Sequence, residues 1–301
     1  MLSNLIQQTY TNNCNYKITH SDSINNGKCF IFFSGHGIFY PETEEEFIKT
    51  IIVKDRYEWS TFKPTRFSKI IQVRDLKKSW YLDGINKELN SIEKVLEFLK
   101  ENTDGLETIC VGNSAGGYAA TLFGSLLNAS HIFNFSGAFD LFKTPMPWKE
   151  DSAIYKYKDL IEYTKLYNLR TIINQKKVPI YYFCPVLVEQ DIIQYNLVQN
   201  IESIKNFTFS SENHGVTCLK INFPDLLDMD LIQLEKLHKQ YQNRIIDDFL
   251  FSFGVSGIHK SIKHLMGSRN RYLIKNKLKK LIRQEYKDVS SITMSSRSIV
   301  K

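Results

Sequence analysis

A serine flanked by glycines is the feature of this sequence that most clearly indicates acyl-transfer chemistry. Residues 112–116 read Gly-Asn-Ser-Ala-Gly, a G-x-S-x-G pattern that directly follows an apolar run. Glycine is needed on both sides of such a serine when the chain turns abruptly from strand to helix, because β-carbons there would collide with the backbone. The turn exposes the hydroxyl at a helix N-terminus, where free N–H groups favour developing negative charge. Ser114 is therefore the predicted nucleophile, and a tightly packed glycine-rich turn is the alternative.

A serine hydroxyl needs a base to remove its proton, and one of the seven histidines is well placed to act as that base. His214 lies in the turn-rich segment Ser-Glu-Asn-His-Gly at 211–215, after the last predicted strand. The loops after parallel strands meet at one edge of a sheet, where Ser114 also emerges. We predict His214 as the general base; a solvated loop histidine is the alternative.

The acid that orients the histidine is expected at the end of the preceding strand. Asp191 occupies that position, just before a predicted helix, and the order serine, acid, histidine along the chain fits this arrangement. Aspartate at that position is also a good helix N-cap, which is the structural alternative. Glu189 and Asp140 are the other candidates for the acid.

Two N–H groups must face the oxygen on which negative charge develops during acyl transfer. The backbone N–H of Ala115, the residue after the nucleophile, is the first candidate. The second is expected from the loop Ser-Gly-His-Gly at 34–37, which is similar to the HG-type loops of esterases, so we name the N–H groups of His36 and Gly37. For the His36 side chain we expect no proton-transfer role.

Short runs of β-branched and aromatic residues alternate with longer segments of helical periodicity. This alternation predicts an α/β fold, with a mostly parallel central sheet and helices on both faces. The predicted strands are residues 28–34, 69–74, 108–113, 131–136, 179–188 and 206–210, and the predicted helices are about 84–102, 115–127, 156–173 and 192–204. A further helical face runs from Leu227 to Phe249 and ends near Gly254 and Gly257.

Charge is divided unevenly along the 301 residues, whose formal net charge is +7. Residues 255–301 hold 12 Lys or Arg and two acids, a net charge of +10, which leaves −3 for residues 1–254. We therefore predict a catalytic domain over 1–254, with a lid-like insertion at 138–177, and a basic amphipathic helical extension over 255–301.

Residues 258–287 of the extension combine spaced apolar residues with nearly all of its lysines and arginines. The functional interpretations of this pattern are peripheral contact with the anionic inner face of the cell membrane and binding of an anionic polysaccharide. A solvated helical face is the alternative. Nucleic acid is not an expected partner, because no known binding motif accompanies the charge.

Several other classes of site have no signature in the sequence. The five cysteines are an odd number and include no C-x-x-C pair, which favours a reducing compartment. No P-loop, no helix-opening G-x-G-x-x-G and no H-E-x-x-H occurs, so we expect no metal and no permanently bound cofactor. Without a secretory signal or a long apolar run, the expected location is the cytoplasm.

Taken together, the 34–37 loop, the serine turn, Asp191 and His214 resemble the α/β-hydrolase superfamily over roughly residues 25–254. A narrower resemblance rests on Arg74-Asp75, Trp80-Tyr81 and Gly84 together with the turn sequence GNSAGGYAA. These residues resemble α/β-hydrolase proteins of bacterial capsule and surface-polysaccharide loci, among them acetyl-CoA-dependent capsule O-acetyltransferases. The resemblance implies an acyl-serine intermediate formed from acetyl-CoA and passed to a sugar hydroxyl of a polysaccharide or oligosaccharide acceptor, which we expect to be anionic.

The residues themselves do not decide between water and a sugar as the acceptor, because both reactions use the same serine, base and oxyanion hole. Aromatic side chains at Trp80, Tyr81 and Trp148 could stack on sugar rings and exclude water; packing beneath a lid is the alternative. The leading hypothesis is an O-acetyltransferase acting on a capsular or surface glycan. A carbohydrate esterase or deacetylase is the second, and a non-catalytic glycan-assembly protein is the third.

Overall fold

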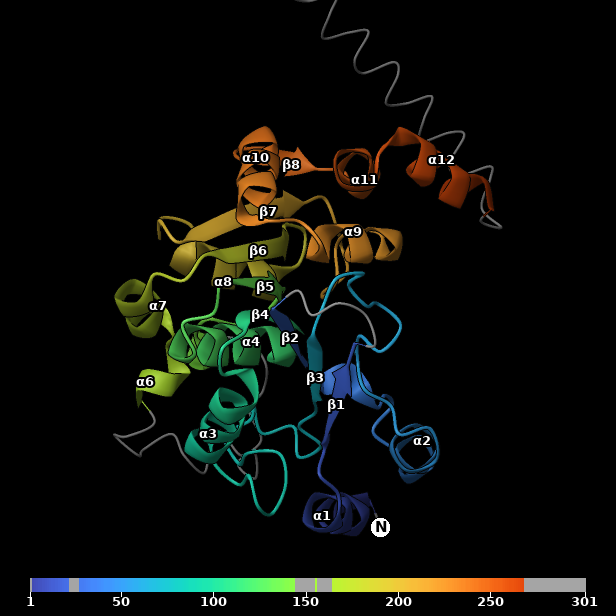
Figure 1. Ribbon diagram of the computed structural model, residues 1–301, viewed down its shortest axis with the longest axis vertical. Coiled ribbons are helices and arrows are strands. Elements are labelled where there is room, and N and C mark those ends of the chain that lie inside the picture. The colour runs from blue at the N-terminus through green and yellow to red at the C-terminus, as the bar shows by residue number, and fades with distance from the viewer. Residues whose placement is uncertain (1, 22–26, 144–154, 156–163, 268–301) are drawn as a thin grey trace, which may run out of the picture.

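A single twisted sheet of eight strands forms the centre of the computed structural model, which describes residues 2–21, 27–143, 155 and 164–267 (Figure 1). The strand order is β1-β3-β2-β4-β5-β6-β7-β8, and all neighbours are parallel except β1 and β3. The strands are β1 (Tyr16–His20), β2 (Lys28–Phe33), β3 (Lys69–Val73), β4 (Glu107–Asn113), β5 (His131–Phe135), β6 (Ile180–Pro185), β7 (Ile204–Phe209) and β8 (Ile245–Ile246).

Helices cover both faces of this sheet, which confirms the predicted three-layer α/β sandwich. Alternate residues of β2 point to opposite faces: Ile31 and Phe33 belong to one apolar cluster, and Phe30 and Phe32 belong to the other. The first cluster is completed by α3 (Ile92–Thr103), α4 (Ala115–Leu126), α7 (Arg170–Lys176) and α8 (Glu189–Val198). The second is completed by α9 (Phe223–Leu227), α10 (Leu231–Tyr241) and α11 (Asp248–Ser256).

The register of the central strands brings four loops to one edge of the sheet. Phe33 at the end of β2 pairs with Gly112 of β4, and Asn113 pairs with Phe135 at the end of β5. Pro185 and Phe209, the last residues of β6 and β7, are also partners. Because these strands are parallel, the loops that follow them gather at the carboxyl edge, as the sequence predicts for its candidate site residues.

All six predicted strands are present, with bounds that differ by at most three residues, and the structure adds β1 and β8 at the two edges. The predicted helix at 84–102 is shorter and begins at Ile92, because the Ser91 side chain accepts a hydrogen bond from the N–H of Lys94 and caps it. The helix predicted at 192–204 is α8 and ends at Val198. Of the helix predicted at 156–173, residues 156–163 lie outside the described part of the chain; α6 (Thr164–Tyr167) and α7 follow.

The continuous helical face predicted from Leu227 to Phe249 is wrong. Three helices and a strand occupy this stretch, because two aspartates begin new helices within it: Asp230 forms a capping box with Gln233 of α10, and Asp247 caps α11. Between α10 and α11, Ile245–Ile246 forms β8 by pairing with the end of β7. Apolar spacing alone does not reveal such interruptions, because each short helix keeps its own apolar face.

The predicted boundary between 254 and 255 falls inside α11. Val255 is buried in the second apolar cluster, and α12 (Ile258–Gly267) follows after Gly257. Ser261 of α12 is fully buried, and its hydroxyl lies 2.8 Å from that of Ser252 in α11. The first part of the basic extension therefore packs against the body, and residues 268–301 lie outside the described part of the chain.

Parts of the predicted lid-like insertion at 138–177 are integrated with the sheet. The Tyr118 hydroxyl of α4 donates a 2.8 Å hydrogen bond to the carbonyl of Leu166 in α6. Residues 144–154 and 156–163, and with them Trp148, lie outside the described part. Within the part that is described, no helix has both the length and the hydropathy needed to cross a bilayer.

The residues of the narrower sequence resemblance, after β3, are structural supports. Arg74 is 1% exposed and forms a 2.9 Å ion pair with Asp55. Asp75 is also buried and accepts a 2.9 Å hydrogen bond from the N–H of Tyr81. The Tyr81 hydroxyl then donates to the carbonyl of Ser34, 2.8 Å away, so this segment anchors the start of the loop that follows β2.

Gly84 closes this segment with a backbone that only glycine fits, and this can be tested against a matched glycine. A β-carbon on Gly84 (φ +65°) would lie 1.9 Å from the carbonyl oxygen of Leu89, whereas one on Gly105 (φ +69°) meets nothing within 4 Å. We expect Gly105→Ala to lower the free energy of unfolding by about 1 kcal/mol, from backbone strain alone. Gly84→Ala should lower it by about 2–4 kcal/mol, because steric overlap adds to the strain. Urea unfolding followed by circular dichroism measures both, and equal losses would contradict the steric argument.

Candidate active site

Ser114 lies at the sharp turn between β4 and α4 that its glycine-flanked motif predicts. Its backbone has φ +55° and ψ −122°, a conformation that non-glycine residues rarely adopt. A β-carbon on Gly112 would lie 1.9 Å from the carbonyl oxygen of Gly116, and one on Gly116 would lie 2.2 Å from that of Phe33. Both glycines are therefore required by close backbone contacts, and the turn holds the Ser114 hydroxyl at the N-terminus of α4.

The structure brings together the three side chains predicted to form a relay. The Ser114 Oγ lies 2.9 Å from Nε2 of His214. Nδ1 of the same imidazole lies 2.9 Å from Oδ2 and 3.1 Å from Oδ1 of Asp191. These separations are within hydrogen-bond reach at both ends of the ring, as a serine, base and orienting acid require.

Asp191 and His214 have contrasting environments. Asp191 is 2% exposed in the first turn of α8, and burial raises the pKa of its carboxyl while the hydrogen bond from His214 opposes that rise. The His214 side chain is 34% exposed, and its loop is held by the Ser136 hydroxyl, which donates to the carbonyl of Gly215 at 2.8 Å. A buried carboxylate at Nδ1 selects the imidazole tautomer that leaves Nε2 free to accept the serine proton.

The hydrogen bonds of the described residues do not support the alternatives, which were Asp191 as a helix N-cap and Asp140 or Glu189 as the acid. Val188, not Asp191, is the N-cap of α8, and no side-chain capping bond is made there. Asp140 accepts hydrogen bonds from the side chain of Asn168 and the N–H of Phe142. Within the described residues, no hydrogen bond joins Asp140 or Glu189 to His214, so Asp191 is the acid that the geometry selects.

Of the predicted oxyanion-hole groups, Ala115 directly follows the serine, and the loop that carries His36 and Gly37 contacts the serine turn. Ala115 is the first residue of α4, where an N–H has no acceptor inside the helix. A β-carbon on Gly35 would lie 2.6 Å from the carbonyl oxygen of Asn113 and 3.5 Å from Cβ of Ser114, so the loop after β2 contacts the serine turn directly. His36 and Gly37 begin the short 3₁₀ turn η1 (His36–Ile38) in that loop.

A cavity of about 250 Å³ opens onto the serine. It is lined by His36, Trp80, Ser114, Ser136, Ala138, Gln190, Asp191, Gln194 and His214. The His36 ring lies 4.9 Å from that of Trp80, and burial, with Lys78 nearby, lowers its pKa to about 3. The imidazole is therefore neutral at ordinary pH and contributes a wall of the cavity.

Of the aromatic residues predicted to contact substrate, Trp80 lines this cavity and Tyr81 does not. Tyr81 is fully buried, and its hydroxyl is bonded to backbone carbonyls of Ser34 and Val73, so direct contact between Tyr81 and a substrate is excluded in this conformation. Both residues have a positive φ in the turn after β3 and belong to the same apolar cluster, but only the Trp80 ring borders the cavity. Trp148 lies outside the described part of the chain.

Sequence reasoning missed Glu58, which supports the loop after β2 from the other side. Its Oε2 accepts a 2.6 Å hydrogen bond from the N–H of Gly35, and Arg56 donates to the carbonyl of Ile38 at 3.2 Å. Trp59 Nε1 donates to the carbonyl of Phe33 at 3.3 Å. Burial raises the pKa of Glu58 to about 7. Residues 56–59 look like an ordinary connection between elements, and nothing in their spacing predicts the hydrogen bond from Gly35 to Glu58.

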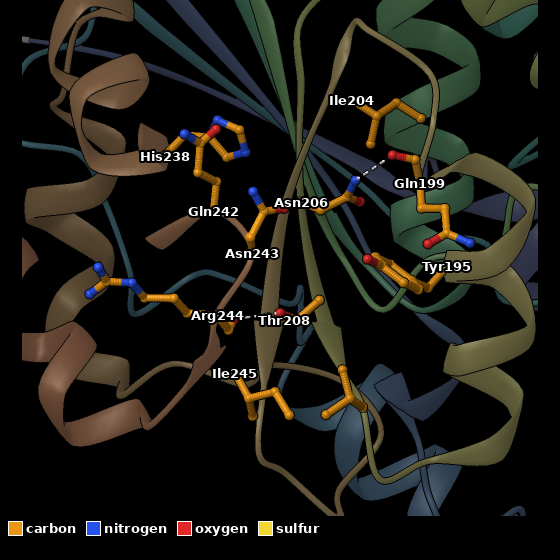
Figure 2. Close-up of a pocket in the computed structure, with 11 residues that line it drawn as sticks. Tyr195, Gln199, Ile204, Asn206, Thr208, His238, Gln242, Asn243, Arg244 and Ile245 are labelled. Atoms are coloured by element: carbon orange, nitrogen blue, oxygen red, sulfur yellow. Dashed lines mark hydrogen bonds between the residues drawn. The ribbon is translucent and has the colours of Figure 1, made fainter. Parts of the chain in front are cut away.

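Another cavity, of about 550 Å³, lies at the β7–β8 edge of the sheet, between α8 and the end of α10 (Figure 2). Figure 2 shows Tyr195 and Gln199 on one side and Gln242 and Asn243 on the other, with Asn206 directed towards the Gln199 carbonyl. None of the predicted site residues that the structure describes lines it, and no carboxylate occurs among its described lining residues. The groups that can perform acyl chemistry are therefore those at the carboxyl edge.

Replacing the buried acid tests the assignment of the relay. We expect Asp191→Asn to lower kcat for hydrolysis of p-nitrophenyl acetate by about 10³- to 10⁴-fold, because an amide holds the imidazole in the wrong tautomer. Glu189→Gln, two residues earlier in the same helix, is the matched control and should retain activity. A large loss in the control and none in Asp191→Asn would reassign the acid.

The raised pKa of Glu58 makes a second prediction, for stability. Because the folded protein holds this proton more tightly than the unfolded chain, Glu58 makes the free energy of unfolding fall as pH rises from about 4.5 to about 7. Glu58→Gln removes this dependence, so the variant should gain stability relative to the wild type between about pH 5 and about pH 7.5. Urea midpoints at the two pH values measure the gain, with the exposed Glu88→Gln as control. A difference that is constant with pH would show that Glu58 does not titrate in this range.

Comparison with solved structures finds chains that share part of this architecture. The capsule O-acetyltransferase of Neisseria meningitidis serogroup A, in complex with caged gadolinium, is 19% identical over 66% of this chain and 85% of its own, with a TM-score of 0.44. MenH from S. aureus is 13% identical over 77% of this chain and 100% of its own, with a TM-score of 0.39. Acetyl xylan esterase 1 from Thermoanaerobacterium sp. is 11% identical over 60% of this chain and 68% of its own, with a TM-score of 0.35.

No protein-family model matches the sequence, and no curated protein matches it. The fold is therefore described from its own topology. A mostly parallel sheet carries a serine turn after β4, an acid after β6 and a histidine after β7, in the chain order serine, acid, histidine. The chain has an α/β-hydrolase-like fold.

Proposed function

We propose that this protein is a serine-dependent O-acetyltransferase that moves an acetyl group from acetyl-CoA, through an acyl-Ser114 intermediate, to a hydroxyl of a bacterial capsular or surface polysaccharide. The observation that carries the proposal is the hydrogen-bonded series from Ser114 Oγ through the His214 imidazole to the Asp191 carboxylate. This series supports acyl chemistry at a serine. Acetyl-CoA as the donor and a sugar hydroxyl as the acceptor are proposed in addition, and the experiment below tests them.

In the first half of the proposed reaction, His214 Nε2 takes the hydroxyl proton of Ser114 as Oγ attacks the thioester carbonyl. The negative charge that develops on the carbonyl oxygen would be held by the N–H of Ala115 and an N–H of the His36–Gly37 turn. As the carbon–sulfur bond breaks, the imidazolium returns the proton to the leaving sulfur. Free CoA departs, and the acetyl group remains as an ester on Ser114.

The second half repeats these steps with a sugar hydroxyl as the nucleophile. His214 removes the proton of the incoming hydroxyl, which attacks the acetyl-serine carbonyl. Collapse of the tetrahedral intermediate forms the acetyl-sugar, and the proton returns to Ser114 Oγ. The cavity of about 250 Å³ beside Trp80 and Ala138 is small and partly apolar, which suits an acetyl group.

A carbohydrate esterase that uses the same residues with water is the second candidate. The observation that favours it is the 34% exposure of the His214 side chain, because water can reach an imidazole that open. A non-catalytic glycan-assembly protein is the third candidate, and the aligned serine, imidazole and carboxylate argue against it.

We also propose that residues 258–287 direct the enzyme to an anionic polysaccharide or to the inner face of the cell membrane, with the catalytic domain in the cytoplasm. The support is their basic amphipathic sequence. In the described part of this segment, Lys260 forms an ion pair with Asp225 of α9 at 2.6 Å, so this lysine contributes to packing against the body.

Incubation of the purified protein with acetyl-CoA, with and without an acidic capsule oligosaccharide, tests the proposal. We expect CoA release that depends on the oligosaccharide, together with an acetyl-sugar detected by mass spectrometry. Ser114→Ala should abolish both, because no other group supplies the nucleophile; a loss of at least about 10³-fold is expected.

The other outcomes separate the candidates. CoA release without acetyl-sugar, together with removal of acetyl groups from an acetylated glycan, would identify the esterase. Activity that persists in Ser114→Ala would eliminate both reactions. Circular dichroism of the variant controls for folding.

A further inference from the structure

A third cavity, of about 320 Å³, lies on the other side of the serine turn from the cavity that contains the Ser114 hydroxyl. It is lined by residues 56–62, Asn113, Val216, Lys220 and Phe223. Trp59 and Phe223 belong to the apolar cluster on the α9–α11 face, whereas the serine-side cavity is bounded by Trp80 and Ala138 of the opposite cluster. The two cavities therefore open on opposite faces of the sheet at the same edge.

The catalytic loops form the partition between the two cavities. Asn113 lines one cavity, and its neighbour Ser114 lines the other. In the histidine loop, Val216 faces the third cavity, whereas His214 faces the serine-side cavity. The loop after β2 contributes to both sides in the same way, because the N–H of Gly35 contacts Glu58 while the next residue lines the serine-side cavity. A group held in the third cavity is thus separated from the reacting atoms by the thickness of one backbone turn.

Two cations, Arg56 and Lys220, line the third cavity. Among the described residues, neither Arg56 nor Lys220 forms an ion pair, and Lys220 forms no side-chain hydrogen bond at all. Arg56 gives one N–H to the carbonyl of Ile38 and keeps its remaining guanidinium donors. Lysine and arginine donors of this kind can bind a planar or tetrahedral oxyanion.

Glu58 is the one carboxylate among the described lining residues, and its negative charge is reduced near neutral pH. Its oxygen accepts the N–H of Gly35 at 2.6 Å, so it is occupied by the loop. Burial raises its pKa to about 7, although Arg56 nearby lowers it, and a substantial fraction is protonated near neutral pH. The cavity is therefore positively charged, with the Ser60 and Thr61 hydroxyls and the Phe62 ring beside the cations.

We propose that this cavity is an anion subsite, in which Arg56 and Lys220 bind a phosphate or carboxylate group of one substrate, and the rest of that substrate extends over the carboxyl edge of the sheet to Ser114. The chemistry fits the phosphates of a CoA thioester and the carboxylates of an acidic glycan alike, because both are oxyanions. The assignment to a substrate rests on the proposed function. The presence of an anion site does not, and it can be measured without turnover.

Binding is measured on the Ser114→Ala protein by isothermal titration calorimetry, with inorganic pyrophosphate, CoA and a sialic acid tetramer as anionic probes and maltotetraose as the neutral probe. We expect at least one anionic probe to bind, more weakly as NaCl rises from about 50 to about 200 mM. Adding Lys220→Gln should weaken that binding about fivefold. Lys63→Gln, an exposed lysine outside the cavity, is the matched control and should leave it unchanged.

The probes distinguish the source of the anion. Sensitivity of CoA binding to Lys220→Gln would assign the subsite to the donor, and sensitivity of the tetramer would assign it to the acceptor. Failure of all three anions to bind, or equal affinities in Lys220→Gln and Lys63→Gln, would overturn the subsite. Hydrolysis of p-nitrophenyl acetate, which carries no anionic group, should be equal in wild type and Lys63→Gln. Loss of p-nitrophenyl acetate hydrolysis in Ser114→Ala tests the role of the serine separately from the subsite.

Discussion

Close backbone contact at the serine turn is the constraint on which the rest of the site depends. Ser114 is held at φ +55° because β4 ends against the start of α4. A β-carbon on Gly112 would lie 1.9 Å from the carbonyl oxygen of Gly116, so the backbones are in close contact there. The loop after β2 contacts the same turn through Gly35. Strained backbone persists only where its surroundings over-determine it, and here the end of β4, the start of α4 and the sequence-distant loop after β2 do so. The result is a hydroxyl presented at a helix N-terminus, at a fixed position relative to the loops after β2, β6 and β7.

Buried carboxyl groups hold those loops in place. Asp191 orients the imidazole, Glu58 accepts the N–H of Gly35, and Asp75 accepts the N–H of Tyr81, whose hydroxyl reaches the carbonyl of Ser34. Burial raises the pKa of all three, to about 7 for Glu58 and about 6 for Asp75. Desolvation disfavours their charged forms, so each depends on the hydrogen bonds it accepts. The site is therefore preorganised by carboxyl groups whose desolvation lowers the free energy of unfolding. Such groups are common where function requires fixed geometry.

The loops that hold Ser114 also separate two cavities whose linings differ in chemistry. The serine-side cavity has Trp80 and a neutral His36 as walls, whereas the cavity beyond Asn113 presents Arg56 and Lys220. A reaction between two substrates needs one place for the acyl group and another for whatever carries or receives it. Two cavities lie at the carboxyl edge of one sheet, because the loops that meet there project over both of its faces.

What the sequence by itself determined were the features with local causes: the six main strands from their apolar runs, the serine turn from its glycines, and Asp191 and His214 as candidates from their positions after strands. It could not reveal the breaks at Asp230 and Asp247, because capping competes with an apolar periodicity that continues through them. Only the tertiary structure decided which carboxylate faces His214, that Tyr81 points inward while Trp80 lines the cavity, and that Glu58 and Arg56 support the loop after β2. These are contacts between residues distant in the chain, and their distances depend on how the layers pack rather than on spacing along the sequence.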